Sequence, residues 1–303
     1  MKALNDSRGG SLHSVNDPSQ MAEDSNLRSR HVRELIDESR PLEAGSTPRP
    51  VLIPKVIVQF WHDSSAIPAD VKECIESWRP LTGNDFKRVF FDEPQARTFI
   101  ANEFGRPYID AFHRCEHPAM QCDYFRLCYI VKNGGFYVDS DEVYQGGDCD
   151  ALFADERLKI QPMCYDTSKR CMVDGDVFWG SKACRPEWSF YVNNNPLIAP
   201  PAHPVIRLAL ERSTRMLLSR SENRFDVQAM TGPMNLTASL VKHSIESESA
   251  GRPRDFLLLT HWDAISTSPW SLSYRNDERN WRFWQFLRLT NRKVGLDFAG
   301  MRG

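Results

Sequence analysis

The chain has 303 residues, of which 41% are hydrophobic and 11% aromatic, as expected for a folded protein with a substantial core. Its 38 basic and 40 acidic residues nearly cancel, so the overall charge gives no indication of a nucleic-acid partner. The eight cysteines contain no CxxC pair and no Cys/His spacing of the zinc type, which argues against a structural zinc site.

The first 50 residues are polar and rich in Ser, Asp, Arg and Pro. They contain one candidate helix, in the stretch SNLRSRHVRELIDESR, and no apolar segment of the kind found in secretory signals. We interpret residues 1–50 as a tail or loosely docked arm, followed by one folded domain in residues 51–303. No stretch approaches the roughly 20 apolar residues that a membrane span needs, so we expect a cytoplasmic protein.

The composition changes at residue 51, where strands and helices are predicted to alternate. The nearly continuous apolar run VLIPKVIVQFW, residues 51–61, predicts a strand that is buried on both faces, as in a parallel sheet. A helix is expected in PADVKECIESWRPLTG, then a strand in FKRVFFD and a helix in PQARTFIANEFG. This alternation predicts an α/β fold with a mostly parallel sheet flanked by helices.

The next helix and strand lead to two aspartates. Residues 119–141 read AMQCDYFRLCYIVKNGGFYVDSD, in which apolar residues at helical spacing predict a helix that ends at Gly134 and Gly135. The residues that follow begin a strand, so Asp139 and Asp141 lie at its carboxyl end. In open α/β sheets this is where ligands bind.

Two carboxylates held close together are costly unless a cation joins them. A hard divalent ion, Mg²⁺ or Mn²⁺, is the natural partner, and it keeps positions open for phosphate oxygens. A bare DxD is short, however, and also fits an ordinary solvated strand end. Two enzyme classes use it in this setting: a phosphohydrolase fold whose DxDx(T/V) string matches DSDEV at residues 139–143, and glycosyltransferases that use nucleotide sugars.

The flanking residues favour the second class. QCDYFRLCYIVKNGGFYVDSD, residues 121–141, resembles the pattern (S/A)DxxRxxxLYxxGGxYxDxD of glycosyltransferase family 32. IPKVIVQFW, the Ser77-Trp78 pair, NNPLIAPPAHP and TGPMNLT resemble further landmarks of that family in the same order, from about residue 51 to about residue 270. The family includes yeast-type initiating mannosyltransferases and bacterial capsular-sugar transferases, and the large clostridial glucosylating toxins share a related core.

The chain departs from the family pattern at three places. Val58 stands where the family has His, which removes a polar group near the nucleotide. Cys122 replaces a Ser or Ala, and Tyr129-Ile130 replaces Leu-Tyr. We interpret the last two departures as packing changes.

The resemblance implies a fold and a reaction. The fold is the A-type glycosyltransferase fold with a Rossmann-like nucleotide-binding core, in one catalytic domain of residues 51–303. The reaction is metal-dependent, retaining transfer of a hexose from a UDP- or GDP-sugar to a hydroxyl acceptor, in polysaccharide or glycoconjugate synthesis. A glycan, a lipid-linked sugar and a protein hydroxyl all remain open as acceptors. No carboxylate is clearly placed as a nucleophile, so we expect same-face attack assisted by the leaving phosphate.

The resemblance also implies roles for four residues. Asp141 would bind the metal directly, and Asp139 would bond the donor ribose and reach the metal directly or through water. Asp123 and Arg126 are three residues apart on a predicted helix, so their side chains share one face and could fix the hexose together. The alternative is an ordinary surface ion pair, which the apolar neighbours of both residues argue against.

Further donor contacts are expected at three positions. Trp61 could stack on the donor base or serve as a core tryptophan, and Gln59 belongs to the same family segment. Asn194 aligns with a family asparagine that would bond the sugar or the acceptor. Its neighbours Asn193 and Asn195 could take that place if the alignment slips by one.

The family's late motif, a His followed by Ser-Trp, is only loosely matched. HWDAISTSPWS offers His261 as a metal contact, with Ser268 and Trp270 as donor contacts, but the spacing fits poorly. A lone His in an aromatic setting is more often packed than ligating. Glu142, directly after Asp141, receives no role.

Residues 279–293 interleave aromatic and basic side chains. Core packing of a terminal helix is the simpler interpretation; the alternative is peripheral contact with a membrane near a lipid-linked acceptor. Two rival functions stay open, a DxD phosphohydrolase and a non-catalytic module that binds nucleotide sugars. The sequence does not indicate the oligomeric state.

Overall fold

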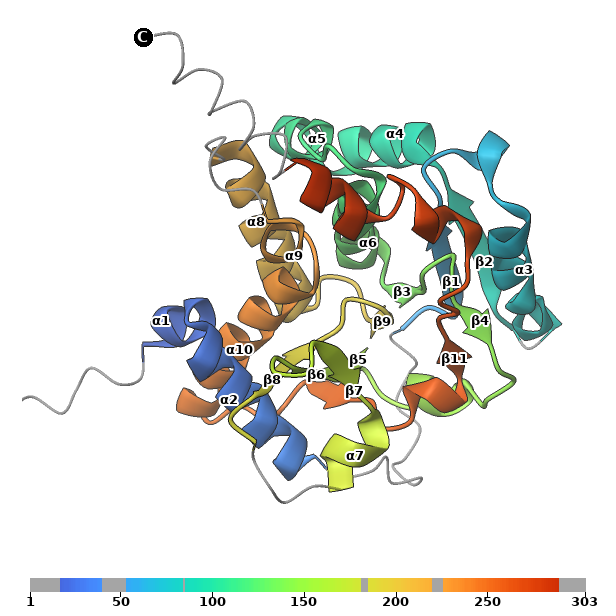
Figure 1. Ribbon diagram of the computed structural model, residues 1–303. Helices are drawn as coiled ribbons and strands as arrows, with labels where there is room; N and C mark the ends of the chain where they lie inside the picture. The colour runs from blue at the N-terminus through green and yellow to red at the C-terminus, as the bar shows by residue number, and fades with distance from the viewer. Residues whose placement is uncertain (1–16, 40–52, 84, 181–184, 220–225, 289–303) are drawn as a thin grey trace, which may run out of the picture.

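The computed structural model describes residues 17–39, 53–83, 85–180, 185–219 and 226–288. A six-stranded sheet lies at the centre, in the order β10-β5-β9-β3-β1-β2 (Figure 1). Its strands are β1 Val56–Phe60, β2 Lys87–Phe91, β3 Gly135–Tyr137, β5 Leu158–Ile160, β9 Leu197–Ala199 and β10 Phe256–Leu258. β1 is parallel to β2 and β3, and β10 is parallel to β5, whereas β9 is antiparallel to both of its neighbours. The expected α/β fold with a mostly parallel sheet is confirmed.

The first predicted strand is β1, and it is buried on both faces. Val58 and Phe60 belong to the main apolar cluster, whereas Ile57 packs into a second cluster on the opposite face. An apolar side chain is therefore needed at successive positions, which explains the nearly continuous apolar run.

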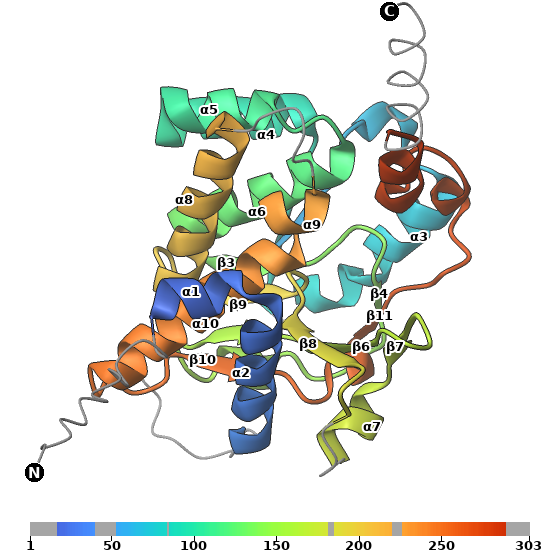
Figure 2. The ribbon, with the colours of Figure 1, turned by 60° about the vertical axis from the view of Figure 1, so that its left-hand side comes forward.

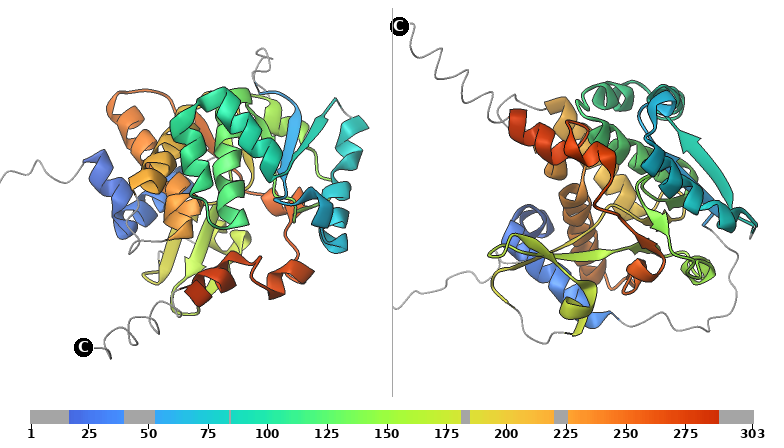
Figure 3. Two further views of the ribbon diagram at one scale, coloured as in Figure 1. Left: turned by 90° about the horizontal axis from the view of Figure 1, so that it is seen from above. Right: turned by 45° about the vertical axis from the view of Figure 1, so that its right-hand side comes forward.

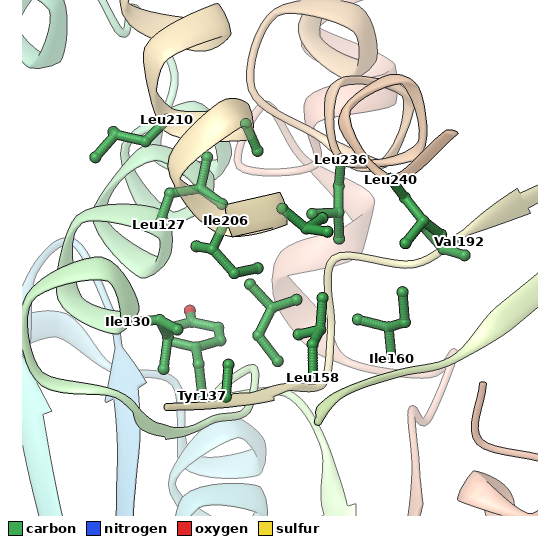
Figure 4. Packing of buried hydrophobic residues seen from close by; sticks show 14 of the residues in the cluster. Leu127, Ile130, Tyr137, Leu158, Ile160, Val192, Ile206, Leu210, Leu236 and Leu240 are labelled. Carbon is green, nitrogen blue, oxygen red and sulfur yellow. The ribbon is translucent and has the colours of Figure 1, made fainter. Parts of the chain in front are cut away.

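One face of the sheet is covered by helices that pack on the main cluster. They are α4 Glu93–Phe104, α5 Arg106–His113, α6 Pro118–Asn133, α8 Pro204–Ser219 and α10 Pro233–Ser249. Figure 4 shows apolar side chains of α6, α8 and α10 meeting those of the strands, among them Leu127, Ile206, Leu236, Tyr137 and Leu158. Removing these side chains from water is the main stabilising contribution of this layer.

Shorter elements cover the opposite face. They are α3 Ala69–Ser77, η2 Arg79–Gly83, η3 Asp150–Phe153 and η4 Trp262–Ala264. The second cluster lies between them and the sheet, with Trp78 and Phe136 in edge-to-face contact at 5.5 Å between ring centroids.

Two small sheets and several short helices complete the described fold. β4 Val143–Tyr144 pairs with β11 Ser266–Thr267, and β6 Pro162–Asp166 lies between β7 Cys171–Val173 and β8 Trp188–Val192. The short helices are η1 Ser64–Ala66, α7 Gly175–Gly180, α9 Val227–Met230 and η5 Ser273–Asn276.

The N-terminal segment differs from the expectation of a loosely docked arm. The predicted helix forms as α2 Ser25–Glu38, preceded by α1 Pro18–Glu23; α1 lies beside α10, and α2 lies beside β8 and α10 (Figure 2). Val32, Leu35 and Ile36 make one apolar face of α2, which is buried in the main cluster. Residues 18–38 are therefore a docked layer of the fold, while residues 1–16 and 40–50 lie outside the described part.

The aromatic C-terminal segment is helical at residues 281–288, and it lies against the beginning of α6 (Figure 3). Trp281 and Trp284 pack against the main cluster, and the Trp284 ring is 5.0 Å from the His117 ring. Phe283 and Phe286 are exposed. The core-packing interpretation thus holds for the two tryptophans, and residues 289–293 lie outside the described range. None of the helices in the described ranges is long and apolar enough to cross a membrane.

Gly134 and Gly135 form the joint between α6 and β3. Both have positive φ, +66° and +113°, which side chains with a Cβ rarely adopt. A Cβ on Gly134 would lie 2.7 Å from the Cδ of Pro201, and one on Gly135 would lie 3.0 Å from the carbonyl oxygen of Val56. The joint therefore needs glycine at both positions, and it turns the chain back so that β3 runs beside β1.

Candidate active site

A cleft of about 430 Å³ opens at the carboxyl ends of β1 and β3. Eight of the predicted site residues line it: Trp61, Asp123, Arg126, Asp139, Asp141, Asn194, Ser268 and Trp270. They come from segments far apart in the sequence, which the parallel pairing of β1 with β3 and the position of α6 bring to one edge of the sheet.

Arg126 is the centre of a buried polar network on α6. Its Nη2 donates to Asp139 Oδ1 at 2.8 Å and lies 3.0 Å from Asp123 Oδ1, while its Nη1 donates to the backbone oxygen of Asn194 at 2.7 Å. The guanidinium also lies 4.5 Å from the centre of the Tyr137 ring. Burial alone would lower the pKa of Arg126, but the charge of Asp139 contributes most to holding that pKa well above its usual value.

Asp123 lies next to Arg126 on the same face of α6, as the spacing predicts. Its Oδ1 accepts a hydrogen bond from Asn194 Nδ2 at 2.8 Å, and its Oδ2 accepts one from Thr231 Oγ1 at 3.3 Å. Burial raises the pKa of Asp123, against the effect of Arg126. Because both side chains are buried, this is not a surface ion pair.

Asp139 faces the cleft directly after β3. Its Oδ1 accepts hydrogen bonds from Arg126 and from the Tyr137 hydroxyl, and its backbone N–H donates to Asn195 Oδ1 at 2.9 Å. Its Oδ2 accepts no hydrogen bond from the described residues. Burial raises the pKa of Asp139 to about 6; the charge of Asp141 adds to this rise and Arg126 opposes it.

Asp141 is held by two side chains that the sequence did not indicate. Its Oδ2 accepts hydrogen bonds from the Tyr274 hydroxyl at 2.5 Å and from Arg275 Nη2 at 2.6 Å. Arg275 Nη2 also donates to Ser268 Oγ at 2.8 Å, and its guanidinium lies 4.7 Å from the centre of the Trp270 ring. Tyr274 and Arg275 lie in the polar stretch SLSYRNDERN, beyond the last landmark of the family resemblance and without apolar periodicity, so no signal in the sequence pointed to them.

Glu142 and Asn195 connect the aspartates to neighbouring elements. Glu142 Oε1 accepts a hydrogen bond from Asn195 Nδ2 at 3.1 Å, and its Oε2 accepts one from Ser266 Oγ at 2.5 Å. Burial, with smaller contributions from Asp141 and Asp139, raises the pKa of Glu142 to about 8. Glu142 thus connects β11 to the segment that carries the aspartates, a role that the sequence left unassigned.

Trp61 is both packed in a small apolar cluster and placed at the wall of the cleft. It is 9% exposed and packs with Val71 and Ile75, yet it also lines the cleft. Its ring meets the Tyr274 ring edge-on, at 5.4 Å between centroids. The indole Nε1 is buried and has no hydrogen-bond partner among the described residues.

Two of the predicted site residues, Gln59 and His261, do not line this cleft. Gln59 lies on the same face of β1 as Ile57, because side chains alternate along a strand, and it lines a separate cavity of about 410 Å³ beside Arg88. His261 is exposed just before η4. Within the described ranges no group of three or more His, Cys, Asp or Glu side chains is arranged to hold a metal ion.

Comparisons with known proteins match one segment of the chain to a family. Residues 68–157 match the family described as "Glycosyltransferase sugar-binding region containing DXD motif". Over 93 residues, or 30% of its length, the chain is 28% identical to uncharacterized glycosyltransferase L373 of Acanthamoeba polyphaga mimivirus. The chain matches only 37% of that relative's length. A solved structure, "PaToxG Glycosyltransferase", aligns with 88% of this chain and 94% of its own, at 14% identity and a TM-score of 0.44.

Proposed function

We propose that this chain, whose residues 68–157 match the sugar-binding region of DXD-containing glycosyltransferases, transfers a hexose from a UDP- or GDP-sugar to a hydroxyl acceptor. The observation that carries this proposal is the buried network of Asp123, Arg126 and Asp139, which faces a cleft that Asp141 also lines. A cleft of about 430 Å³ falls within the range of small-molecule sites. We assign the reaction to residues 51–303, with α1 and α2 docked on this unit.

Asp139 and Asp141 suit a divalent metal ion. Each carboxylate has one oxygen in hydrogen bonds and a second oxygen, Asp139 Oδ2 and Asp141 Oδ1, without a donor among the described residues. The charge of Asp141 helps to raise the pKa of Asp139, a repulsion that a cation would relieve. Carboxylate oxygens are the ligands that Mg²⁺ and Mn²⁺ prefer. When bound, the ion would neutralise the diphosphate leaving group.

The remaining polar groups of the cleft would orient the donor. We propose that Asp123 accepts hydrogen bonds from sugar hydroxyls, that Asn194 contributes a further contact, and that Arg126 holds both in place. Trp61 would contact the base, and Ser268 and Trp270 the phosphates. Fixed donors and acceptors of this kind lower the barrier because they need no reorganisation during the reaction.

The hydrogen bonds of the buried acids support retention without a covalent intermediate. Both oxygens of Asp123 and both oxygens of Glu142 already accept hydrogen bonds from protein groups. A carboxylate held in this way is a poor nucleophile toward the donor sugar. We therefore propose that the acceptor attacks on the face that the diphosphate leaves, with the leaving phosphate taking the acceptor proton.

The acceptor and the cellular setting belong to the same proposal. A glycan, a lipid-linked sugar or a protein hydroxyl would enter through the open side of the cleft, in polysaccharide or glycoconjugate synthesis. We also propose a cytoplasmic location with peripheral membrane contact through residues 279–293; the exposed Phe283 and Phe286 beside Arg282 support the membrane contact. Vesicle co-sedimentation with and without anionic lipid tests that contact.

A thermal-shift screen of UDP- and GDP-sugars, with and without Mn²⁺, tests the proposal. A donor that binds only the folded state raises the melting temperature, and we expect the rise to need Mn²⁺. Binding without hydrolysis or transfer would favour the rival binding module. Release of phosphate from a simple phosphomonoester, unaffected by Arg126→Ala, would favour the phosphohydrolase.

Asp141→Asn tests the metal assignment. We expect Mn²⁺-dependent donor turnover to fall by at least about 100-fold, because the amide is a far weaker ligand for a hard cation. The matched control is Asp148→Asn, a change of an exposed acid in the same segment that does not line the cleft. Turnover that survives in Asp141→Asn, with the fold intact, would refute the assignment.

A further inference from the structure

Asp141 already has a cationic partner in this structure. Arg275 Nη2 lies 2.6 Å from Asp141 Oδ2, and only 14% and 16% of the two side chains is exposed. The Tyr274 hydroxyl donates to the same oxygen at 2.5 Å. The carboxylate proposed to contact the metal is therefore neutralised by the protein itself.

A guanidinium and a divalent ion cannot share this carboxylate without cost. An ion at Oδ2 would take the place of both donors, and an ion at Oδ1 would lie within a few ångströms of a positive charge. Such repulsion is strong where solvent screening is reduced, as it is for this largely buried pair. The Arg275 guanidinium must therefore move away from Asp141 before a divalent ion binds there.

Arg275 is held less firmly than Arg126, the other guanidinium that contacts the aspartate pair. Arg126 lies within the 16-residue helix α6 and also donates to the Asn194 backbone, whereas Arg275 lies in the four-residue turn η5. The Arg275 guanidinium lies over Trp270, which is 68% exposed, whereas the Arg126 guanidinium lies over the buried ring of Tyr137. Moving Arg275 therefore breaks few contacts other than those to Asp141 and Ser268.

We propose that Arg275 is a built-in competitor for the metal position: it neutralises Asp141 in the resting protein and must leave that carboxylate before a divalent ion binds. The inference rests on the proposed metal role of Asp141 and adds a residue that sets the affinity for the ion. Tyr274 supports the same resting arrangement, because its hydroxyl holds Asp141 Oδ2 and its ring contacts Trp61. Metal affinity is then lower than the two aspartates alone would provide, since part of the binding free energy displaces Arg275.

Mn²⁺ binding in the absence of any nucleotide tests this proposal, with the free ion measured by electron paramagnetic resonance. We expect Arg275→Gln to bind Mn²⁺ on the order of tenfold more tightly than the unmodified chain. Tyr274→Phe should shift affinity in the same direction by less, because it removes a neutral donor only. The matched control is Arg279→Gln, which removes the same charge from the same cleft but pairs with Asp277, and it should change Mn²⁺ affinity little.

A second variant covers the case in which Arg275→Gln unfolds. Arg275→Lys keeps the charge, but its single ammonium does not reproduce the flat guanidinium stacked on Trp270, so we expect Mn²⁺ affinity between those of the unmodified chain and Arg275→Gln. Unchanged or weaker Mn²⁺ binding in folded Arg275→Gln would overturn the proposal. Equal tightening in Arg279→Gln would overturn it too, because a general charge effect would then explain the result.

The test separates this inference from the proposed function. If neither the unmodified chain nor Arg275→Gln binds Mn²⁺, the competition is refuted, while donor binding in the thermal-shift screen still reports on the transferase. If Mn²⁺ binding tightens in Arg275→Gln but no nucleotide sugar binds or turns over, the competition holds and the transferase proposal fails.

Discussion

Two groups of charged side chains in the described part of the fold, each with a buried cation at its centre, differ in that only one of them faces the cleft. Outside the cleft, Lys159 on β5 is fully buried and its Nζ donates to the backbone oxygen of Asp155 at 2.6 Å and to Asp155 Oδ1 at 2.8 Å. Arg157 donates to Asp155 Oδ2 from two nitrogens. These three residues lie within one short segment, and both oxygens of the Asp155 carboxylate accept hydrogen bonds. We call Asp155, Arg157 and Lys159 the closed group.

The group in the cleft, which consists of Asp123, Arg126, Asp139, Asp141 and Arg275 and which we call the open group, differs from the closed group in two respects. Its members come from α6, the end of β3 and the turn η5, and some of its polar atoms have no partner among the described residues. Those atoms are Asp139 Oδ2, Asp141 Oδ1, and the Nε atoms of Arg126 and Arg275. Burial and short ion pairs therefore do not mark a binding site by themselves. In the cleft they occur together with two carboxylate oxygens, Asp139 Oδ2 and Asp141 Oδ1, that have no hydrogen-bond donor among the described residues.

The largest expected effect tests the closed group. Asp155→Asn leaves the ammonium of Lys159 buried without its counter-ion, and we expect the free energy of unfolding to fall by about 3 kcal/mol. The separate variant Lys159→Met removes the buried positive charge itself, so it should lower the free energy of unfolding by much less. Urea unfolding measures both changes. A loss below about 1 kcal/mol in Asp155→Asn would contradict a stabilising role for this pair.

The next effect tests the open group. Arg126→Lys keeps the positive charge but not the flat fork that reaches Asp139 and the Asn194 backbone together, so we expect donor turnover to fall by about 100-fold with a stability loss of about 1–2 kcal/mol. Arg157→Lys makes the same exchange in the closed group and should leave turnover unchanged. Equal losses of turnover in the two variants would remove the functional distinction between the groups.

The smallest effect is a pH dependence near the closed group. His203 is buried, and burial lowers its pKa below the usual value of 6.5, although the nearby Asp255 opposes the shift; His243 and Lys159 add to the lowering. Below pH 6.5 the unfolded chain takes up a proton that folded His203 does not, so stability should decrease as the pH falls from 6.5 toward the lowered value. Chemical unfolding at pH 7 and pH 5.5 measures this decrease. It should be smaller in His203→Gln, and an unchanged slope would contradict the assignment.

Local patterns in the sequence predicted the elements that carry the cleft. The apolar run of β1 and the helical spacing of α6, with its glycine stop, are each specified by neighbouring residues, so Asp123, Arg126, Asp139 and Asp141 could be placed on their elements from the sequence alone. The i,i+3 relation of Asp123 and Arg126 is a property of any helix. That both would be buried followed from their apolar neighbours.

Contacts between distant segments could not be predicted in this way. Tyr274 and Arg275 meet Asp141 across 133 and 134 residues, from a loop without periodicity. Gln59 lies away from the cleft for another reason: the strand was predicted correctly, but which of its faces turns toward the cleft depends on the packing of the whole sheet. His261 rested on a spacing that already matched poorly, and the fold leaves it exposed before η4.

The glycine joint between α6 and β3 makes the position of Arg126 relative to Asp139 depend on the number of residues on each side of the joint. From Arg126 to Gly134 the helix advances about 12 Å, and from Gly135 to Asp139 the extended chain returns about 13 Å. The two lengths match, so the guanidinium and the carboxylate meet at 2.8 Å. One residue inserted into either arm would rotate or offset one partner against the other. The number of residues between Arg126 and Asp139 is therefore as much a part of the site as the side chains themselves.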